Sequence, residues 1–180
     1  MVETASSMVP LGTTMPSFSL PAIAGGLWTP SEGSTGTLVV FMCNHCPFVI
    51  HIAETLCLVH RISKEKNIEM VGINSNDIEA YPEDTPEKMA ETAKYYGWQF
   101  PYVFDATQEV ATQFSATCTP DTFLYNSEKK LIYRGQFDDS RPHSGESTGI
   151  DLIQALEALT SNLPAQESQK PAIGCNIKWK

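Results

Sequence analysis

The chain has 180 residues, of which 42% are hydrophobic, and its formal net charge is −9. A chain of this length can bury roughly 70% of its unfolded surface in one core, so we expect a single domain over residues 1–180. Nucleic acids and anionic membranes bind basic patches. Because the 12 lysines and arginines are scattered along an acidic chain, we expect neither nucleic acid nor a membrane as a partner.

No hydrophobic run approaches the ~18 residues of a membrane span, and residues 1–14 lack the basic and apolar regions of a secretory signal peptide. We therefore expect a cytoplasmic protein. A processed periplasmic form stays open, because a chain whose signal peptide has been removed would show the same pattern.

The first half of the chain is predicted to alternate strands with helices. A weak strand is expected at Ser17–Ile23 and a strong, continuously apolar one at Thr37–Met42. Apolar residues then recur with helical spacing to about Lys64. Asn44 is the predicted N-cap of this helix, and Pro47 falls in its first turn, where a missing amide hydrogen breaks no helical hydrogen bond.

The second half continues the alternation and then adds a hairpin. The predicted elements are a strand at Ile68–Ile73, helices at Thr85–Tyr96 and Glu109–Phe114, hairpin strands at Thr122–Tyr125 and Leu131–Arg134, and a helix at Leu152–Leu159. This order predicts an α/β fold with a mixed central sheet and helices on both faces. Residues from about 163 to 180 are predicted to form a C-terminal tail in loop conformation.

Two of the five cysteines, Cys43 and Cys46, lie three positions apart where the strong strand gives way to the helix. The unpaired amides of a helix N-terminus favour a thiolate and lower the pKa of a cysteine below about 8.5. We expect Cys43 to be the exposed attacking thiolate and Cys46, which is more buried, to resolve the mixed disulfide. Cys57 lies about 16 Å along the same predicted helix, beyond disulfide reach, and is interpreted as a packing residue.

Several segments, together with the predicted elements, resemble the thioredoxin fold and, more closely, a bacterial thioredoxin-like family. That family is grouped in the redoxin superfamily with alkyl hydroperoxide reductase and thiol-specific antioxidant proteins, which are peroxiredoxin-like. The segments cover nearly the whole chain: Cys43–Pro47, Gly72–Asp77, Tyr81–Asp84, Phe100–Tyr102, Cys118–Asp121, Tyr133–Gly135, Asp138–Pro142 and Ile173–Cys175. The resemblance implies that residues from about 75 to 99 form a redoxin-type insertion, and that Thr119-Pro120 holds a cis-proline apposed to the substrate.

The resemblance implies a thiol-disulfide oxidoreductase with roles in cell redox homeostasis and antioxidant defence. Its redox group would be the Cys43–Cys46 disulfide, with no other cofactor and no metal. The partners would be a protein or small-molecule disulfide and an unidentified thiol reductant. His45, with Asn44 beside it, would tune the potential, because protein disulfide isomerase also carries histidine at this place. We expect a potential nearer to about −120 to −180 mV than to the about −270 mV of thioredoxin.

A thiol peroxidase is an alternative. Peroxiredoxins carry threonine three residues before the peroxidatic cysteine, whereas Val40 holds that place here, which speaks against peroxide chemistry. Cys175 near the chain end could still act as a resolving cysteine from a partner subunit, so a homodimer stays open. The simpler interpretation makes Cys175 an inert thiol in a docked tail that Trp179 anchors.

A metal-binding or noncatalytic module is a further alternative. A CxxC pair is often half of a zinc site, and Cys118, Cys175 or a histidine could complete it with zinc or copper. A second CxxC is absent, so these ligands would have to converge from distant parts of the chain.

Three polar residues are further site candidates. Asn74 and Asn76 follow a predicted strand that ends beside Cys43, so they could bind an extended substrate backbone or simply form a turn. Arg141 lies near Asp138 and Asp139, which favours a surface ion pair but leaves a site role open. No buried proton acceptor is visible, because Thr37 stands where thioredoxins carry a buried aspartate.

Overall fold

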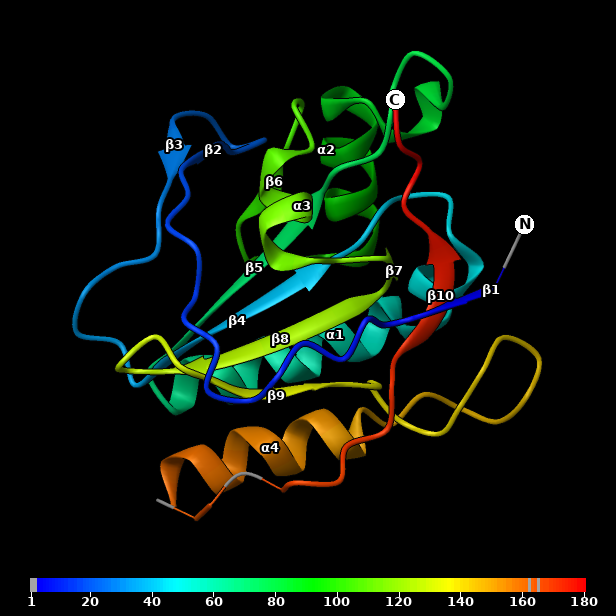
Figure 1. Ribbon diagram of the computed structural model, residues 1–180. Coiled ribbons are helices and arrows are strands. Elements are labelled where there is room, and N and C mark those ends of the chain that lie inside the picture. Colours follow the sequence, from blue (N-terminus) through cyan, green and yellow to red (C-terminus); the bar gives the residue numbers. More distant parts are fainter. Residues whose placement is uncertain (1–2, 162, 165) are drawn as a thin grey trace.

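The computed structural model describes residues 3–161, 163–164 and 166–180. Its centre is a mixed five-stranded sheet of order β6-β5-β4-β8-β9 (Figure 1). The strands are β4 (Gly36–Phe41), β5 (Ile68–Asn74), β6 (Tyr102–Phe104), β8 (Asp121–Asn126) and β9 (Leu131–Gly135). Strands β4, β5 and β6 are parallel, whereas β8 is antiparallel to β4 and β9.

Helices cover both faces of this sheet. The helices are α1 (Pro47–Glu65), the 3-10 helix η1 (Pro82–Asp84), α2 (Pro86–Tyr96), α3 (Glu109–Phe114) and α4 (Ile150–Thr160). Apolar residues of α1, α2 and α4 pack on one face, and those of α3 and the N-terminal segment pack on the other. The predicted α/β architecture with a mixed sheet is therefore confirmed. None of the described helices is long and apolar enough to cross a membrane.

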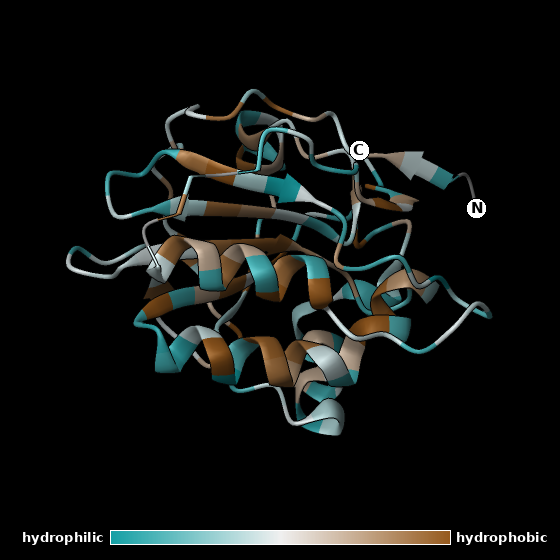
Figure 2. Cartoon of the chain, turned by 90° about the horizontal axis from the view of Figure 1, so that it is seen from below, coloured by the Kyte–Doolittle hydropathy of each residue, from teal (hydrophilic) through white to brown (hydrophobic). Residues whose placement is uncertain are grey.

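Strand β4 contributes to the hydrophobic clusters on both faces of the sheet, because its side chains alternate between the two faces. Leu38 and Val40 join the cluster under α1 and α4, while Val39 and Phe41 join the opposite cluster, where the Phe41 ring packs against Phe114. A strand buried on both faces needs a continuous apolar run, as this sequence has. In Figure 2 the hydrophobic colour accordingly concentrates on the central strands, and the connecting loops are mostly hydrophilic.

Within the C-terminal tail, residues 173–176 form a strand, whereas its other described residues have the predicted loop conformation. Strand β10 (Ile173–Asn176) pairs antiparallel with β1 (Glu3–Ala5) on one side and with β7 (Cys118–Thr119) on the other, as Figure 1 shows. Strands this short carry no readable periodicity, and their partners lie far away in sequence. Trp179 does not anchor this tail, because it is 47% exposed, whereas Ile177 is buried.

Two further local predictions were wrong. The weak strand predicted at Ser17–Ile23 reduces to β2 (Leu20–Pro21), which pairs with β3 (Leu27–Trp28). Asn44 is not the N-cap of α1: Cys46 takes that place with extended backbone angles, and Pro47 opens the helix. Asn44 instead uses its side chain to bind a neighbouring segment.

Candidate active site

The two predicted redox cysteines lie in the connection between β4 and α1, close to the N-terminus of the helix. Cys43 is 1% exposed and Cys46 is 0% exposed. The prediction that Cys43 is exposed was therefore wrong, because the insertion and the loop before β8 close over the connection. No disulfide joins the described cysteines.

Thr119 and Pro120 face this cysteine pair, and the bond between them is cis, as the resemblance implied. The Cys43 Sγ lies 3.6 Å from the Thr119 hydroxyl, and the Cys46 thiol donates a hydrogen bond of 3.0 Å to the Thr119 carbonyl. Thr119 thus contacts both sulfurs, one through its side chain and one through its backbone.

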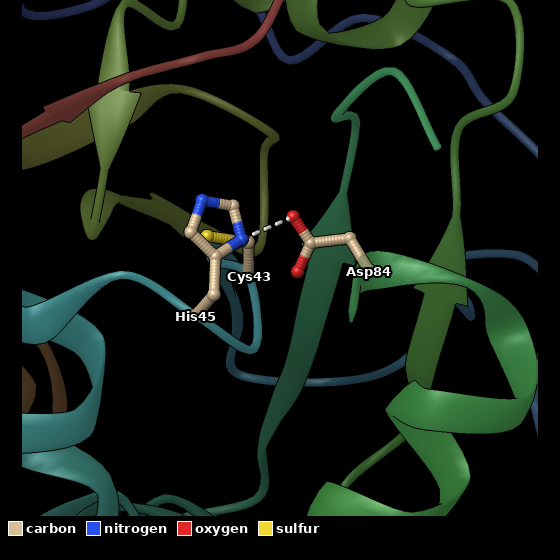
Figure 3. Close-up of side chains that lie close together, drawn as sticks. All are labelled: Cys43, His45 and Asp84. Atoms are coloured by element: carbon tan, nitrogen blue, oxygen red, sulfur yellow. Dashed lines mark ion pairs between the residues drawn. The ribbon is translucent and has the colours of Figure 1, made fainter. Parts of the chain in front are cut away.

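Asp84 is a site residue that the sequence did not single out. It ends η1 within the predicted insertion and is 0% exposed. Its Oδ1 accepts a hydrogen bond of 2.8 Å from the Asn44 backbone amide, and its Oδ2 lies 2.7 Å from the His45 Nδ1 (Figure 3). A buried carboxylate beside the cysteine connection is therefore supplied from another part of the chain.

Amide side chains hold Asp84 in place. Asn76 donates 2.7 Å to the Asp84 Oδ2, and Asn74 donates 3.0 Å to its backbone carbonyl. Asn44 donates 2.9 Å to the Glu83 carbonyl and accepts from the Tyr102 hydroxyl at 3.1 Å. Both Asn74 and Asn76 are buried, so they position Asp84 instead of presenting free amides to a substrate backbone.

His45 lies beside Cys43. Its ring stacks on Tyr81 with 4° between the planes, and Figure 3 shows the ring in front of the Cys43 side chain. The Cys43 Sγ, the His45 nitrogen and an Asp84 oxygen lie within 4.8 Å of one another. Asp84 raises the pKa of His45, so positive charge is held near Cys43 and is balanced by the carboxylate.

A hydrogen bond between the two thiols moves their pKa values in opposite directions. This interaction is the largest cause of the lowered pKa of Cys46, which falls to about 5. It is also the largest cause of the raised pKa of Cys43, followed by burial and the charge of Asp84. The sequence predicted the lowered pKa at Cys43. The structure favours the first negative charge on Cys46, the N-cap residue, while Cys43 faces a carboxylate.

We expect thiolate absorbance in the reduced protein to develop as the pH rises through about 5. In Cys43→Ser the largest cause of the shift is gone, so the midpoint should move up toward about 8.5. Because the folded pKa of Cys46 lies below its ordinary value, this thiolate stabilises the reduced fold in alkaline solution, and that stability is lost as the pH falls to about 5. Ultraviolet titration checks both statements, with Cys57→Ser as the unchanged control. A midpoint near 8.5 in the unmutated protein would contradict them.

Residues 11–134 of the chain match the AhpC/TSA family. The chain belongs to this family. Two solved structures are similar over nearly its whole length. The first is an uncharacterized conserved protein from Geobacillus kaustophilus, with 44% identity, a TM-score of 0.96, and coverage of 100% of this chain and 97% of that one. The second is a hypothetical protein from Sinorhizobium meliloti 1021, with 44% identity, a TM-score of 0.95, and coverage of 98% of each chain.

A more distant solved structure has the same fold. It is the thioredoxin domain of a thiol-disulfide oxidoreductase from Bacteroides vulgatus, with 16% identity, a TM-score of 0.66, and coverage of 84% of this chain and 99% of that one. The chain matches no curated protein. The predicted thioredoxin fold and the resemblance to the redoxin superfamily are confirmed.

Cys118 is a buried thiol in this AhpC/TSA protein. Burial raises its pKa well above the ordinary value, and the neighbouring Asp121 raises it further. Burial also raises the pKa of Asp121, to about 7. Asp121 pairs with Phe41 of β4, two residues before Cys43, so the AhpC/TSA chain holds another buried carboxyl close to the cysteine connection. Asp121 belongs to the segment Cys118–Asp121, which is part of the resemblance, but the sequence did not indicate that it is buried.

Arg141 does not form the predicted surface ion pair. Its guanidinium donates to the backbone carbonyls of Asp138 and Ser140 and to the Gln136 side chain. Asp138 is buried and accepts hydrogen bonds from the backbone amides of Ser140, Thr148 and Gly149. These contacts shape a shallow hollow beside Pro120, which Phe48, His51 and Arg141 help to line.

Among the described residues, Cys43, His45 and Asp84 form the group that could hold a metal ion, because their ligand atoms lie within 4.8 Å of one another. Thiolate, imidazole and carboxylate are ligands that zinc accepts, so this set could hold a metal with one further ligand. The metal site considered from the sequence has other ligands, because it combines the CxxC pair with Cys118, Cys175 or a histidine.

Proposed function

We propose that this AhpC/TSA family protein is a thiol-disulfide oxidoreductase in which Cys43 and Cys46 form the redox pair. The observation that carries the proposal is the juxtaposition of the two thiols, at the N-terminus of α1, with Thr119, which contacts both sulfurs, and with the cis Pro120. Vicinal thiols at a helix N-terminus can close a disulfide intramolecularly, which favours rapid resolution of a mixed disulfide.

The first step is attack by Cys43 on a substrate disulfide. When the substrate arrives, the proton shared by the two sulfurs moves to Cys46, and the Cys43 thiolate bonds to one substrate sulfur while the other leaves as a thiolate. Access requires a local opening, since Cys43 is 1% exposed and the partly exposed His45 lies beside it. The hollow that Pro120 helps to line is a candidate surface for the substrate.

The second step is attack by Cys46 on the Cys43 sulfur. The mixed disulfide breaks, the remaining substrate sulfur leaves as a thiolate, and the Cys43–Cys46 disulfide forms. The proton shared by the two sulfurs and one proton from water end on the two product thiols, so the substrate gains two electrons and the enzyme loses two. An external thiol reductant then restores the dithiol. We place this cycle in the cytoplasm, with a protein or small-molecule disulfide as the substrate.

Insulin reduction with dithiothreitol as the electron source tests this proposal. Cys43→Ser is expected to abolish the rate above the dithiothreitol background, because the attacking sulfur is lost. Cys46→Ser is expected to retain a mixed disulfide with a model peptide disulfide, detectable by mass spectrometry, because resolution is blocked. Cys57→Ser, a thiol change further along α1, should leave the rate unchanged. An undiminished rate in Cys43→Ser, or the lack of a trapped adduct in Cys46→Ser, would overturn the proposal.

A thiol peroxidase is the second candidate, and the match to the AhpC/TSA family favours it. In that reaction Cys43 would attack a hydroperoxide, release an alcohol and become a sulfenic acid, and Cys46 would then displace water to form the disulfide. Consumption of cumene hydroperoxide without insulin reduction would select this function.

A further inference from the structure

Three cysteines surround Thr119. Two are the redox pair, whose sulfurs contact the Thr119 hydroxyl and carbonyl. The third is Cys175, which lies directly across from Thr119 in the antiparallel pairing of β10 with β7. Cys175 also lies in the same buried cluster as Cys43 and Cys46, and each of the Cys46 and Cys175 thiols shifts the pKa of the other. A residue from the last strand of the chain therefore reaches the sulfur that resolves the mixed disulfide.

The approach of β10 to Thr119 depends on Gly174. A Cβ at that position would lie 2.1 Å from the Thr119 carbonyl oxygen, so only glycine permits this backbone contact. Cys175 is 2% exposed and lies in the same buried cluster as Cys43 and Cys46. The redox partners that the fold brings to this thiol are therefore other cysteines of the same chain.

We propose that Cys175 is a third redox cysteine, which exchanges with the Cys43–Cys46 disulfide to form a Cys46–Cys175 disulfide and to free Cys43. This inference rests on the redox pair of the proposed function. Cys175, as a thiolate, attacks the Cys46 sulfur, the Cys43–Cys46 bond breaks, and its electron pair leaves with Cys43. The proton released by Cys175 passes to Cys43, so the protein is neither oxidised nor reduced in the exchange and no further reactant is needed.

The exchange follows the two catalytic steps in time. Burial raises the pKa of Cys175 to about 12, whereas that of Cys46 is lowered, so resolution by Cys46 is faster than attack by Cys175. The consequence is an oxidised protein in which Cys43 is again a thiol. Such a protein can form a second mixed disulfide while it still holds the first oxidising equivalent in its interior.

Disulfide mapping after oxidation with diamide tests the exchange, because diamide converts two thiols into one disulfide. Cys43, Cys46 and Cys57 share the tryptic peptide that ends at Arg61, whereas Cys175 lies in a different peptide, so fragmentation of the linked peptides identifies the cysteine that is joined. We expect Cys43→Ser to form a link between the two peptides in most chains, through Cys46 and Cys175. The unmutated protein should show both the internal Cys43–Cys46 bond and the link, together with maleimide-reactive Cys43.

Matched variants separate the outcomes. Cys175→Ser and Cys175→Ala should lose the link and the reactive Cys43 after oxidation, yet retain the Cys43–Cys46 disulfide. Cys118→Ser should retain the link. The inference is overturned if folded Cys43→Ser gives no link, gives only dimers through Cys46, or if Cys118→Ser abolishes the link. Failure of the unmutated protein to form Cys43–Cys46 at all would instead contradict the proposed function.

Discussion

Replacement of Asp84 by asparagine is expected to lower the free energy of unfolding by roughly 3 kcal/mol. The Asp84 carboxylate is buried and accepts hydrogen bonds from the Asn44 backbone amide and the Asn76 side chain, besides its ion pair with His45. Asparagine has the same shape but only one acceptor oxygen, so at least one buried donor loses its partner. Urea unfolding of the reduced proteins measures the difference.

The same substitution should change the dependence of stability on pH. The pKa of His45 is raised in the folded protein, so its pairing with Asp84 contributes stability that is fully present below about 6.5 and is lost as the pH rises through the folded pKa. The loss caused by Asp84→Asn should therefore be larger in mildly acidic than in alkaline solution. Partial exposure of His45 weakens this part of the effect. An NMR titration of the His45 ring should show a lower pKa in the variant.

Asp139→Asn is the matched control for this prediction. Asp139 forms an ion pair of 2.8 Å with Lys170, and both side chains are mostly exposed. Screening by water leaves such an exposed pair little effect on stability. If both variants lose equally little stability, Asp84 does not organise the site as its contacts indicate.

The central part of the fold was predictable because its signals are local. The apolar run that forms β4, the helical spacing of α1 and the polar turn between β8 and β9 all lie within about 20 residues of sequence. Strands β1, β6, β7 and β10 carry no such signal, because each has at most four residues and is defined by a distant partner. Their existence is a property of tertiary pairing.

The site was predictable in part for the same reason. Cys43 and Cys46 form a local pattern, and Thr119-Pro120 entered through a resemblance. Asp84 lies 40 residues from the Asn44 amide that it binds, in a segment where Glu83 and Asp84 are both acidic. Only the placement of η1 against the cysteine connection buries Asp84 and leaves Glu83 at the surface. The partial exception is Asn76, whose position after β5 indicated the correct edge of the sheet but not its hydrogen bond to Asp84.

Alanine at Gly174 is expected to cost about 1–3 kcal/mol of stability and to remove the Cys46–Cys175 disulfide. Its Cβ would lie 2.1 Å from the Thr119 carbonyl oxygen and 2.6 Å from the carbonyl carbon, and neither backbone atom can rotate away as a flexible side chain would. Strand β10 must therefore move away from β7, which separates Cys175 from Cys46. Thermal unfolding measures the first effect, and disulfide mapping after diamide treatment measures the second.

Gly145→Ala shows whether this result is specific to the contact with Thr119. Gly145 has a φ of +84°, and nothing lies within 4 Å of a Cβ there, so alanine costs only the left-handed conformation, roughly 1 kcal/mol. This variant should retain the Cys46–Cys175 link in full. If Gly174→Ala also retains it, β10 tolerates the added methyl group without moving, and the close approach to Thr119 is not what brings Cys175 to the redox pair. If the link disappears only in Gly174→Ala, the backbone contact between β10 and β7 controls the chemistry of the third thiol.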